Sequence, residues 1–415
     1  MPVTTTTDPA PSGVHDDAAS VIASARRAVV ADRYAANSFA VEWRSLAKLD
    51  PIAAAWRDLA GRALEPNVFY EPDFALPAAT VFGAGAGAVL VWAGTSPQKL
   101  LGFFPARAEA RRYGVKFPVL VGWTHPYAPL GTPLVDREAA EPVIAAWLGY
   151  VANDPALPQR LLLPFVPEDG PFAAILDRIL YRARMPSADF GRHARAQLAP
   201  HDDRADYIER SMGTRRLKEL RRLARRLGEM GALIFTVAND QPSVASAIED
   251  FFSLEAGGWK GQAGTAAVWH DDVCYFFTAA LDALSAAGKV AINRILLDGR
   301  PIAATITLRS ADAAWFWKIA YDEAFARYSP GVMLTIAVTE GLLDAPGIAR
   351  TDSCATADHP MIDRIWRERL PLCDRLIGLA PEERFGVVRG LEKTRRRVRA
   401  VAKKLRELVH ALAQR

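Results

Sequence analysis

The stretch from Arg327 to Met333, RYSPGVM, combines a cation, a proline and a glycine at the expected start of a helix. Pro330 presets a helical φ, and Gly331 lets a backbone or a ligand come close. The first-turn N–H groups of Gly331, Val332 and Met333 would lack intrahelical partners and form an anion site, which the helix dipole reinforces. Arg327 would add a charge-assisted contact to a phosphate. The pattern predicts a pyrophosphate site, although an ordinary helix that begins at proline has the same pattern.

A glycine-rich loop supplies a second group of candidate residues. Lys260 is suited to hold a carboxylate or a phosphate, and Trp259 to stack on an acceptor molecule. The glycines around this pair would make an unusually mobile structural loop; they are Gly257, Gly258, Gly261 and Gly264. The alternative is a loop that ends a helix, with a buried tryptophan and a solvated lysine.

Three carboxylates are candidates for accepting a proton from an amine or a hydroxyl. Asp322 follows Tyr321 at the end of an expected strand, and it is equally suited to capping the next turn. Its neighbour Glu323 is expected to be such a cap. Glu255, near the end of an expected helix, and Asp352, at the edge of an expected strand, are the other two candidates, and a turn role is equally open for Asp352.

The cysteines and histidines predict neither a covalent nucleophile nor a metal centre. Cys354 and His359 have no activated pairing, and the three cysteines of the chain lack disulfide or metal-site spacing. The cluster His270–Asp272 has adjacent ligands and no second cluster, so a solvated loop is expected. We therefore expect no metal, a reducing compartment and a cytoplasmic protein.

The elements that must position these residues follow an α/β pattern. The 415 residues, 50% hydrophobic and 24% charged, suggest about two domains. The first half predicts the order β-α-β-β-loop-α-β-α, with residues 117–136 as the loop, and the second half repeats this theme. Within it, Trp315, Trp317 and Ile319 are expected on one face of a strand.

We predict a disordered leader and two domains, followed by a basic amphipathic tail; the ranges are 1–37, 38–200, 201–380 and 381–415. No run of 18 apolar residues occurs, so no transmembrane helix is expected. The net charge of +4 does not by itself call for nucleic acid. A basic helix over residues 215–226 could bind RNA, an anionic polymer or CoA phosphates, but its leucines favour a solvated amphipathic helix. The tail could contact an acidic membrane surface or a partner, and the lack of Trp and Phe in residues 390–415 favours the partner.

Three stretches carry a resemblance to a known family: residues 254–266, the hairpin 298–304, and residues 318–331. From Tyr207 to about Trp366 the chain resembles the GNAT-related acetyltransferases of the CelD/BcsL group, associated with cellulose and exopolysaccharide biosynthesis. More distantly it is similar to Fem-type aminoacyl transferases, which carry two GNAT-like domains. The sequence departs from the family at Ile362-Asp363, where a Tyr-Lys pair is usual.

The resemblance implies an α/β fold with mixed (α+β) sheets and two GNAT-like domains in tandem. The second domain would bind acetyl-CoA or another acyl-CoA as co-substrate, in a cleft between splayed strands that ends at the Pro330 helix. An amine or a sugar hydroxyl, lying between the domains, would attack the thioester directly. Two alternatives are a Fem-like transferase that uses aminoacyl-tRNA and a non-catalytic partner of a polysaccharide-synthesis complex.

Overall fold

The computed structural model describes residues 39–94, 99–199, 206–258, 261, 263–379 and 385–413. The expected leader, 1–37, lies outside the described residues. The strands are β1 Phe39–Ser45, β2 Ala86–Ala93, β3 Leu100–Glu109, β4 Val119–Gly122, β5 Leu134–Val135, β6 Arg160–Pro167, β7 Ser187–Leu198, β8 Leu233–Ala238, β9 Val290–Leu297, β10 Arg300–Ser310, β11 Ala313–Tyr321, β12 Arg350–Asp352 and β13 Glu368–Gly378. The α-helices are α2 Ala53–Gly61, α3 Pro72–Phe82, α4 Ala140–Asn153, α5 Pro171–Ala183, α6 Tyr207–Met212, α7 Thr214–Gly228, α8 Gln241–Gly257, α10 Asp271–Ala286, α11 Pro330–Asp344 and α12 Phe385–Ala413.

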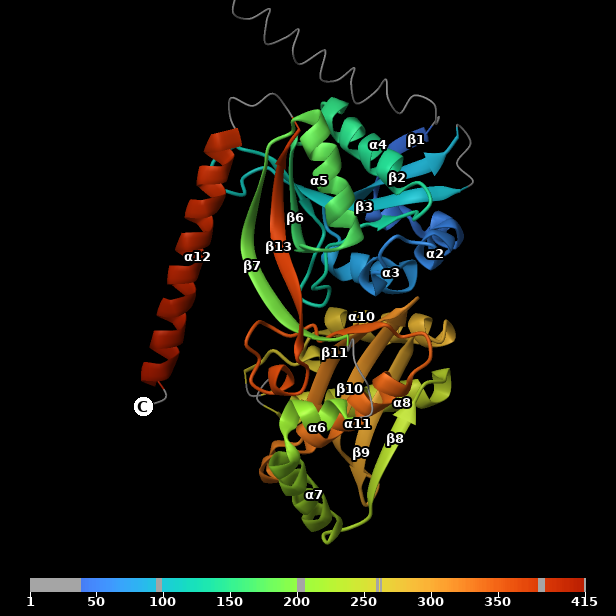
Figure 1. The fold of residues 1–415 in the computed structure, drawn as a ribbon, viewed down its shortest axis with the longest axis vertical. Coiled ribbons are helices and arrows are strands. Elements are labelled where there is room, and N and C mark those ends of the chain that lie inside the picture. Colours follow the sequence, from blue (N-terminus) through green and yellow to red (C-terminus); the bar gives the residue numbers. More distant parts are fainter. Residues whose placement is uncertain are drawn as a thin grey trace, which may run out of the picture.

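One mixed sheet of 13 strands runs through the described residues, in the order β1-β2-β3-β4-β6-β13-β7-β12-β11-β10-β9-β8, with β5 beside β3. Strands β6, β13 and β7 run along the upper half of the molecule, and β8 to β11 form the lower half (Figure 1). Because the sheet mixes parallel and antiparallel pairs and carries helices on it, the predicted α/β class with mixed sheets is confirmed.

Both halves repeat one arrangement. Antiparallel strands are followed by a helix, and the strand after the helix pairs in parallel with the strand before it. In the first half β4 pairs with β6 in parallel, with α4 between them in the chain. In the second half β11 pairs with β12 in parallel, with α11 between them. A parallel pair needs such a crossover connection, which is why a helix follows β4 in the first half and β11 in the second.

Four strands were not predicted. β4 and the two-residue β5 lie in the stretch 117–136, expected to be a loop because prolines and glycines are frequent there. β7 has the polar sequence SADFGRHARAQL, and β13 contains a proline and several charges. β13 pairs with β6 on one side and with β7 on the other, so the last strand of the chain completes the sheet of the first half. The predicted domain boundaries remain a prediction.

Aromatic packing and a buried polar link join the two halves. Phe74 of α3 meets Phe276 of α10 edge to face, with ring centroids 5.2 Å apart. The carboxylate of Glu71, which precedes α3, accepts hydrogen bonds from Lys289 and from Ser310 at the end of β10. A buried carboxylate needs such partners, because leaving its charge unpaired would be costly. None of the described helices is long and apolar enough to cross a membrane.

Candidate functional site

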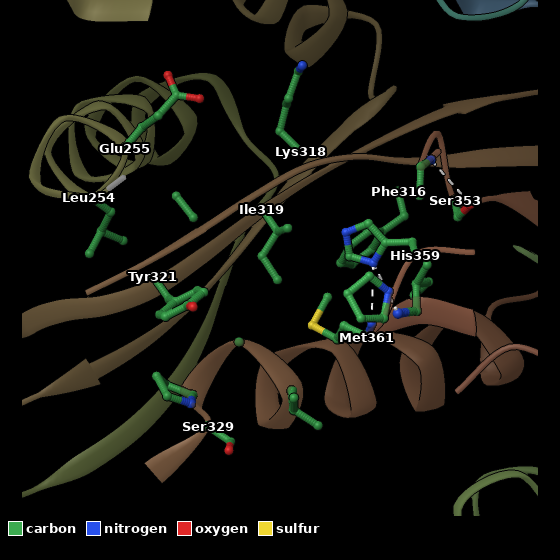
Figure 2. A pocket seen from close by; sticks show the side chains of 18 of the residues that line it. Leu254, Glu255, Phe316, Lys318, Ile319, Tyr321, Ser329, Ser353, His359 and Met361 are labelled. Atoms are coloured by element: carbon green, nitrogen blue, oxygen red, sulfur yellow. Dashed lines mark hydrogen bonds between the residues drawn. The ribbon is translucent and has the colours of Figure 1, made fainter. Parts of the chain in front are cut away.

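A cavity of about 610 Å³ opens where β11 and β12 separate. β11 pairs with β12 only over Ala313–Trp315, and beyond Trp315 it stays paired with β10 on its other side as far as Tyr321. The lining comes from this part of β11, the end of α8, the first turn of α11 and the segment after β12. In Figure 2, Glu255 and Lys318 lie on the α8 side of β11, whereas Ile319 and Tyr321 lie on the α11 side. The cavity therefore reaches both faces of the sheet.

A β-bulge in β11 sets these directions. Lys318 pairs with Ile306 and Phe316 with Thr307, so Trp317 is an extra residue without a partner on β10. A bulge re-aims the side chains that follow it. Trp315 and Trp317 belong to the core on the α8 side, but Ile319 packs on the α11 side. The prediction that Ile319 shares the face of the two tryptophans was therefore wrong, because strict alternation assumes an unbroken strand.

The first turn of α11 forms one wall of the cavity through Ser329, Pro330, Gly331 and Val332. Ser329 is left-handed (φ 57°, ψ 47°), a sparsely populated conformation that clusters at functional sites. A Cβ on Gly331 would lie 3.2 Å from Cδ1 of Tyr321, so the glycine allows the tyrosine ring to pack against the helix. Tyr321, predicted to bind substrate, lines the cavity and is 38% exposed.

Of the three backbone N–H groups expected to be available to an anion at Gly331, Val332 and Met333, two already have a partner in the structure. The N–H groups of Val332 and Met333 both donate to the carbonyl of Ser329, at 3.1 Å. Shared bonds of this kind are common at helix ends. Among the described residues, the Gly331 N–H is the first-turn donor left for a ligand, because Pro330 has none.

Two of the residues predicted at the pyrophosphate site do not line the cavity. Arg327 is exposed, and its guanidinium lies 4.8 Å from the ring centroid of Tyr328. Met333 is buried and packs into the core behind α11. The remaining residues of the set, Pro330, Gly331 and Val332, do line the cavity.

Glu255 and Glu323 line the cavity, but Asp322 does not. Glu255 is only 6% exposed, and one carboxylate oxygen accepts a hydrogen bond from the N–H of Ala267 at 2.8 Å. Asp322 caps the short 3-10 helix Glu323–Tyr328 by accepting from the N–H of Ala324 at 3.0 Å. The expected roles of the two neighbours are therefore exchanged: Asp322 is the cap, and Glu323 faces the site.

Asp352, the third predicted proton acceptor, lies outside this cavity. One of its oxygens accepts from the guanidinium of Arg195 on β7, and the other from the N–H of Cys354 at 2.9 Å. The carboxylate is 5% exposed. With one oxygen in a buried ion pair and the other bonded to a backbone N–H, Asp352 holds the end of β12 in place, and we assign it no catalytic role.

The segment after β12 supplies lining residues that the sequence did not single out as a site. Cys354 and His359 line the cavity, together with Met361. Burial and the nearby Asp352 carboxylate raise the pKa of the Cys354 thiol well above its usual range, so the thiol stays protonated. The Nδ1 atom of His359 accepts from the N–H groups of Met361 and Ile362, both at 3.4 Å. Within the described residues, Cys354 and His359 make their hydrogen bonds to backbone atoms and not to each other.

Lys318 was also missed, because only the bulge in β11 brings its side chain to the site. Its ammonium lies 4.5 Å from the ring centroid of Tyr127, which comes from the first half. Trp259 and Lys260, the predicted acceptor-binding pair, lie outside the described residues. Among the described residues, no group of three His, Cys, Asp or Glu side chains could hold a metal ion.

In the first half, β4 and β6 separate in the same way as β11 and β12, but the chain after β4 fills the space between them. β4 pairs with β6 only at Leu120 and Val121, and the chain after β4 returns to β6. There Gly131 donates its N–H to the carbonyl of Phe165 at 3.1 Å, and a Cβ on Gly131 would lie 2.0 Å from a backbone oxygen of Pro164. Close backbone contact at this point leaves the separation of β11 and β12 as the better candidate site.

A match to a known protein family includes most of the residues that line the cavity between β11 and β12. Residues 214–359 match the model of an acetyltransferase (GNAT) domain. The second half of the chain contains a GNAT domain. The match begins at α7, before β8, and ends at His359, within the segment after β12 that lines the cavity. No curated protein matches the sequence significantly.

Solved structures with the same fold cover most of the chain. FemX has a TM-score of 0.52 at 10% identity, over 78% of this chain and 95% of that one. The C-terminal domain of a putative lysylphosphatidylglycerol synthetase from Agrobacterium fabrum has a TM-score of 0.50 at 10% identity, over 83% of this chain and 95% of that one. These likenesses extend the fold assignment beyond the GNAT domain to both halves. The closer resemblance to the CelD/BcsL group remains a prediction.

Proposed function

We propose that the protein is an acyl-CoA-dependent acyltransferase that transfers an acyl group to an amine or a sugar hydroxyl. The observation that carries the proposal is the cavity between β11 and β12, which ends at the first turn of α11. An acyl-CoA bound there supplies a thioester as the acyl donor. The position fits the expectation from the GNAT domain, and it combines an opening on both faces of the sheet with a helix N-terminus at one end.

The residues present fit such a donor. Gly331 offers an N–H to a phosphate at the positive end of α11. Apolar side chains line the neighbouring wall and suit the aliphatic arm of the donor; they are Phe316, Ile319, Val332 and Met361. Arg327 would reach the phosphates from outside by leaving the ring of Tyr328, and this role remains a proposal.

On the α8 side, Glu255 is the proton acceptor that the geometry favours. Its carboxylate is held by the Ala267 N–H and faces the cavity, so it can take a proton from an attacking amine or hydroxyl, directly or through water. Tyr321 at the opposite side would position the acceptor. A saccharide acceptor, within exopolysaccharide or cellulose biosynthesis, is supported only by the resemblance to the CelD/BcsL group.

The test is the affinity for acetyl-CoA of Gly331→Asp, with Gly341→Asp as its control. Gly341 lies on the same helix, and nothing lies within 4 Å of a Cβ built there, so its carboxylate stays away from the cavity. We expect Gly331→Asp to lose at least about tenfold in affinity by charge repulsion, and Gly341→Asp to bind like the parent. Equal affinities in all three proteins would remove the pyrophosphate assignment.

A second candidate function is transfer from an aminoacyl-tRNA. The fold likeness to FemX supports it, as do the exposed basic side chains of α7: Arg215, Arg216, Lys218, Arg221, Arg222, Arg225 and Arg226. We expect this function to show as tRNA binding that weakens steeply with salt and that falls when Arg221 and Arg225 are changed to Gln. If neither acetyl-CoA nor tRNA binds, a non-catalytic role beside a polysaccharide synthase becomes the better account.

A further inference from the structure

The last helix, α12, is attached to the body by one face of its first half. Val388 is fully buried, and Glu392, on the same face, pairs with Arg112 of the first half at 3.1 Å. Arg396, one turn further, donates to Asp374 of β13 at 2.6 Å. These contacts fix the orientation of the helix, which runs along the outer side of the molecule in Figure 1.

A different face of α12 carries an apolar stripe. Val387, Val398, Val401 and Leu405 are 54%, 62%, 59% and 57% exposed. They lie roughly 140° around the helix from the anchoring face, at about 100° per residue. Leu408 and Leu412 continue the spacing of three and four in the sequence. Side chains this apolar and this exposed on one stripe indicate an interaction surface.

The charges beside the stripe decide what can cover it. Residues 393–406 contain eight cations and no carboxylate, and two of these cations, Arg395 and Arg396, are paired with Glu392 or Asp374. The other six are Lys393, Arg397, Arg399, Lys403, Lys404 and Arg406. The spacing of three and four also fits pairing with a second helix. Pairing with a second copy, however, would bring two such cation clusters together, and like charges at that distance repel. The complementary surface is therefore anionic.

We propose that α12 binds the surface of an anionic phospholipid bilayer. Val398, Val401 and Leu405 would enter the boundary between headgroups and acyl chains, and Arg397 and Lys404, on the adjacent face, would contact the phosphates. The anchoring contacts of Val388, Glu392 and Arg396 would hold the rest of the protein at a fixed orientation to that surface. This inference does not depend on the proposed transferase activity.

The test is co-sedimentation of the full chain with vesicles of phosphatidylglycerol and phosphatidylcholine, against vesicles of phosphatidylcholine alone. The key variant carries Val398→Gln, Val401→Gln and Leu405→Gln, which keep the charge and the helix propensity. Ala400→Gln, exposed on the same helix but off the stripe, is the control. We expect binding only to the anionic vesicles, reduced at least about tenfold in the triple variant and unchanged in the control.

Three results would overturn the proposal. One is no binding of the parent chain to anionic vesicles, and another is equal binding by the parent and the triple variant. The third is a parent that is dimeric by light scattering without lipid while the triple variant is monomeric, which would show that the stripe pairs with a second copy. Circular dichroism of each variant shows whether the fold is intact, so a misfolded variant is recognised separately.

Discussion

The guanidinium of Arg195 on β7 donates to the carboxylate of Asp352 at the end of β12, and the two residues are 2% and 5% exposed. Arg195 also donates to the carbonyl of Pro129 at 3.0 Å. The pair therefore joins the sheet to the segment after β4, which lies between β4 and β6. The pair lies beside the cavity without lining it. The pair therefore stabilises β12, the strand from which β11 separates.

We predict that Asp352→Ala destabilises the protein by about 3–5 kcal/mol, because the buried charge of Arg195 loses its partner. Urea unfolding measures the change. The double variant Arg195→Met, Asp352→Leu should be less destabilised, since it leaves no unpaired charge. A folded Asp352→Ala protein of parental stability that had lost only its catalytic rate would contradict the structural role.

His125 gives the stability a pH dependence. Burial, and to a lesser extent Lys318, lower its pKa to about 3, and the ring stacks on Phe82 with centroids 4.5 Å apart. The unfolded chain binds a proton near pH 6.5, but the folded chain does not until about pH 3. The contribution of His125 is thus complete above pH 6.5 and is lost as the pH falls towards 3.

His125→Phe should remove this contribution. We expect the variant to gain stability relative to the parent by about 1.4 kcal/mol for each pH unit between 6 and 4. Denaturant unfolding of both proteins at several pH values measures the difference, which cancels the titration of the carboxylates they share. A difference that is constant from pH 7 to pH 4 would show that His125 titrates normally in the folded protein.

Glu255 and Asp322 form a matched pair for the proton-acceptor role. Glu255→Gln should lower the turnover number by about 10²–10⁴, because a positioned general base contributes that much. Asp322→Asn should leave turnover near that of the parent, since Asp322 caps a 3-10 helix outside the cavity. The measurement is the rate of CoA release with an acceptor amine. The opposite ranking of the two variants would return the catalytic role to Asp322.

Ser329 offers a test of backbone strain at the cavity. Ser329→Gly should stabilise the protein by up to about 1 kcal/mol, because glycine adopts the left-handed conformation without penalty. Ser329→Val should destabilise it, since a β-branched residue fits that conformation poorly. Thermal unfolding of the two variants checks the order. A more stable valine variant would mean that residue 329 does not adopt this backbone in solution.

Local patterns in the sequence were enough to predict most elements. α8 and α11 begin with a proline in the first turn, α10 is followed by the left-handed Gly288, and the hairpin β9–β10 has Asp298-Gly299 at its turn. β7 and β13 were missed because their stability comes from pairing with each other over most of their length, and a long-range pairing leaves little local signal.

The candidate site was predictable in position but less so in detail. Pro330-Gly331 and Glu255 were found from residue type and spacing, and the structure brings them to one cavity. The bulge at Trp317 re-aims Lys318 and Ile319, and it cannot be predicted from the alternation of apolar and polar residues along the strand. The engagement of Asp352 by Arg195 joins residues far apart in the chain, so spacing could not reveal it.

The proposed function requires the cavity between β11 and β12 to bind an acyl-CoA. Isothermal titration of the full chain with acetyl-CoA, and separately with free CoA, measures this binding. We expect one equivalent to bind at micromolar strength, with CoA competing for the same site. Absence of binding to either ligand at about millimolar concentration, by protein that is folded by circular dichroism, would rule out the acyl-CoA site, since useful affinities lie well below that level.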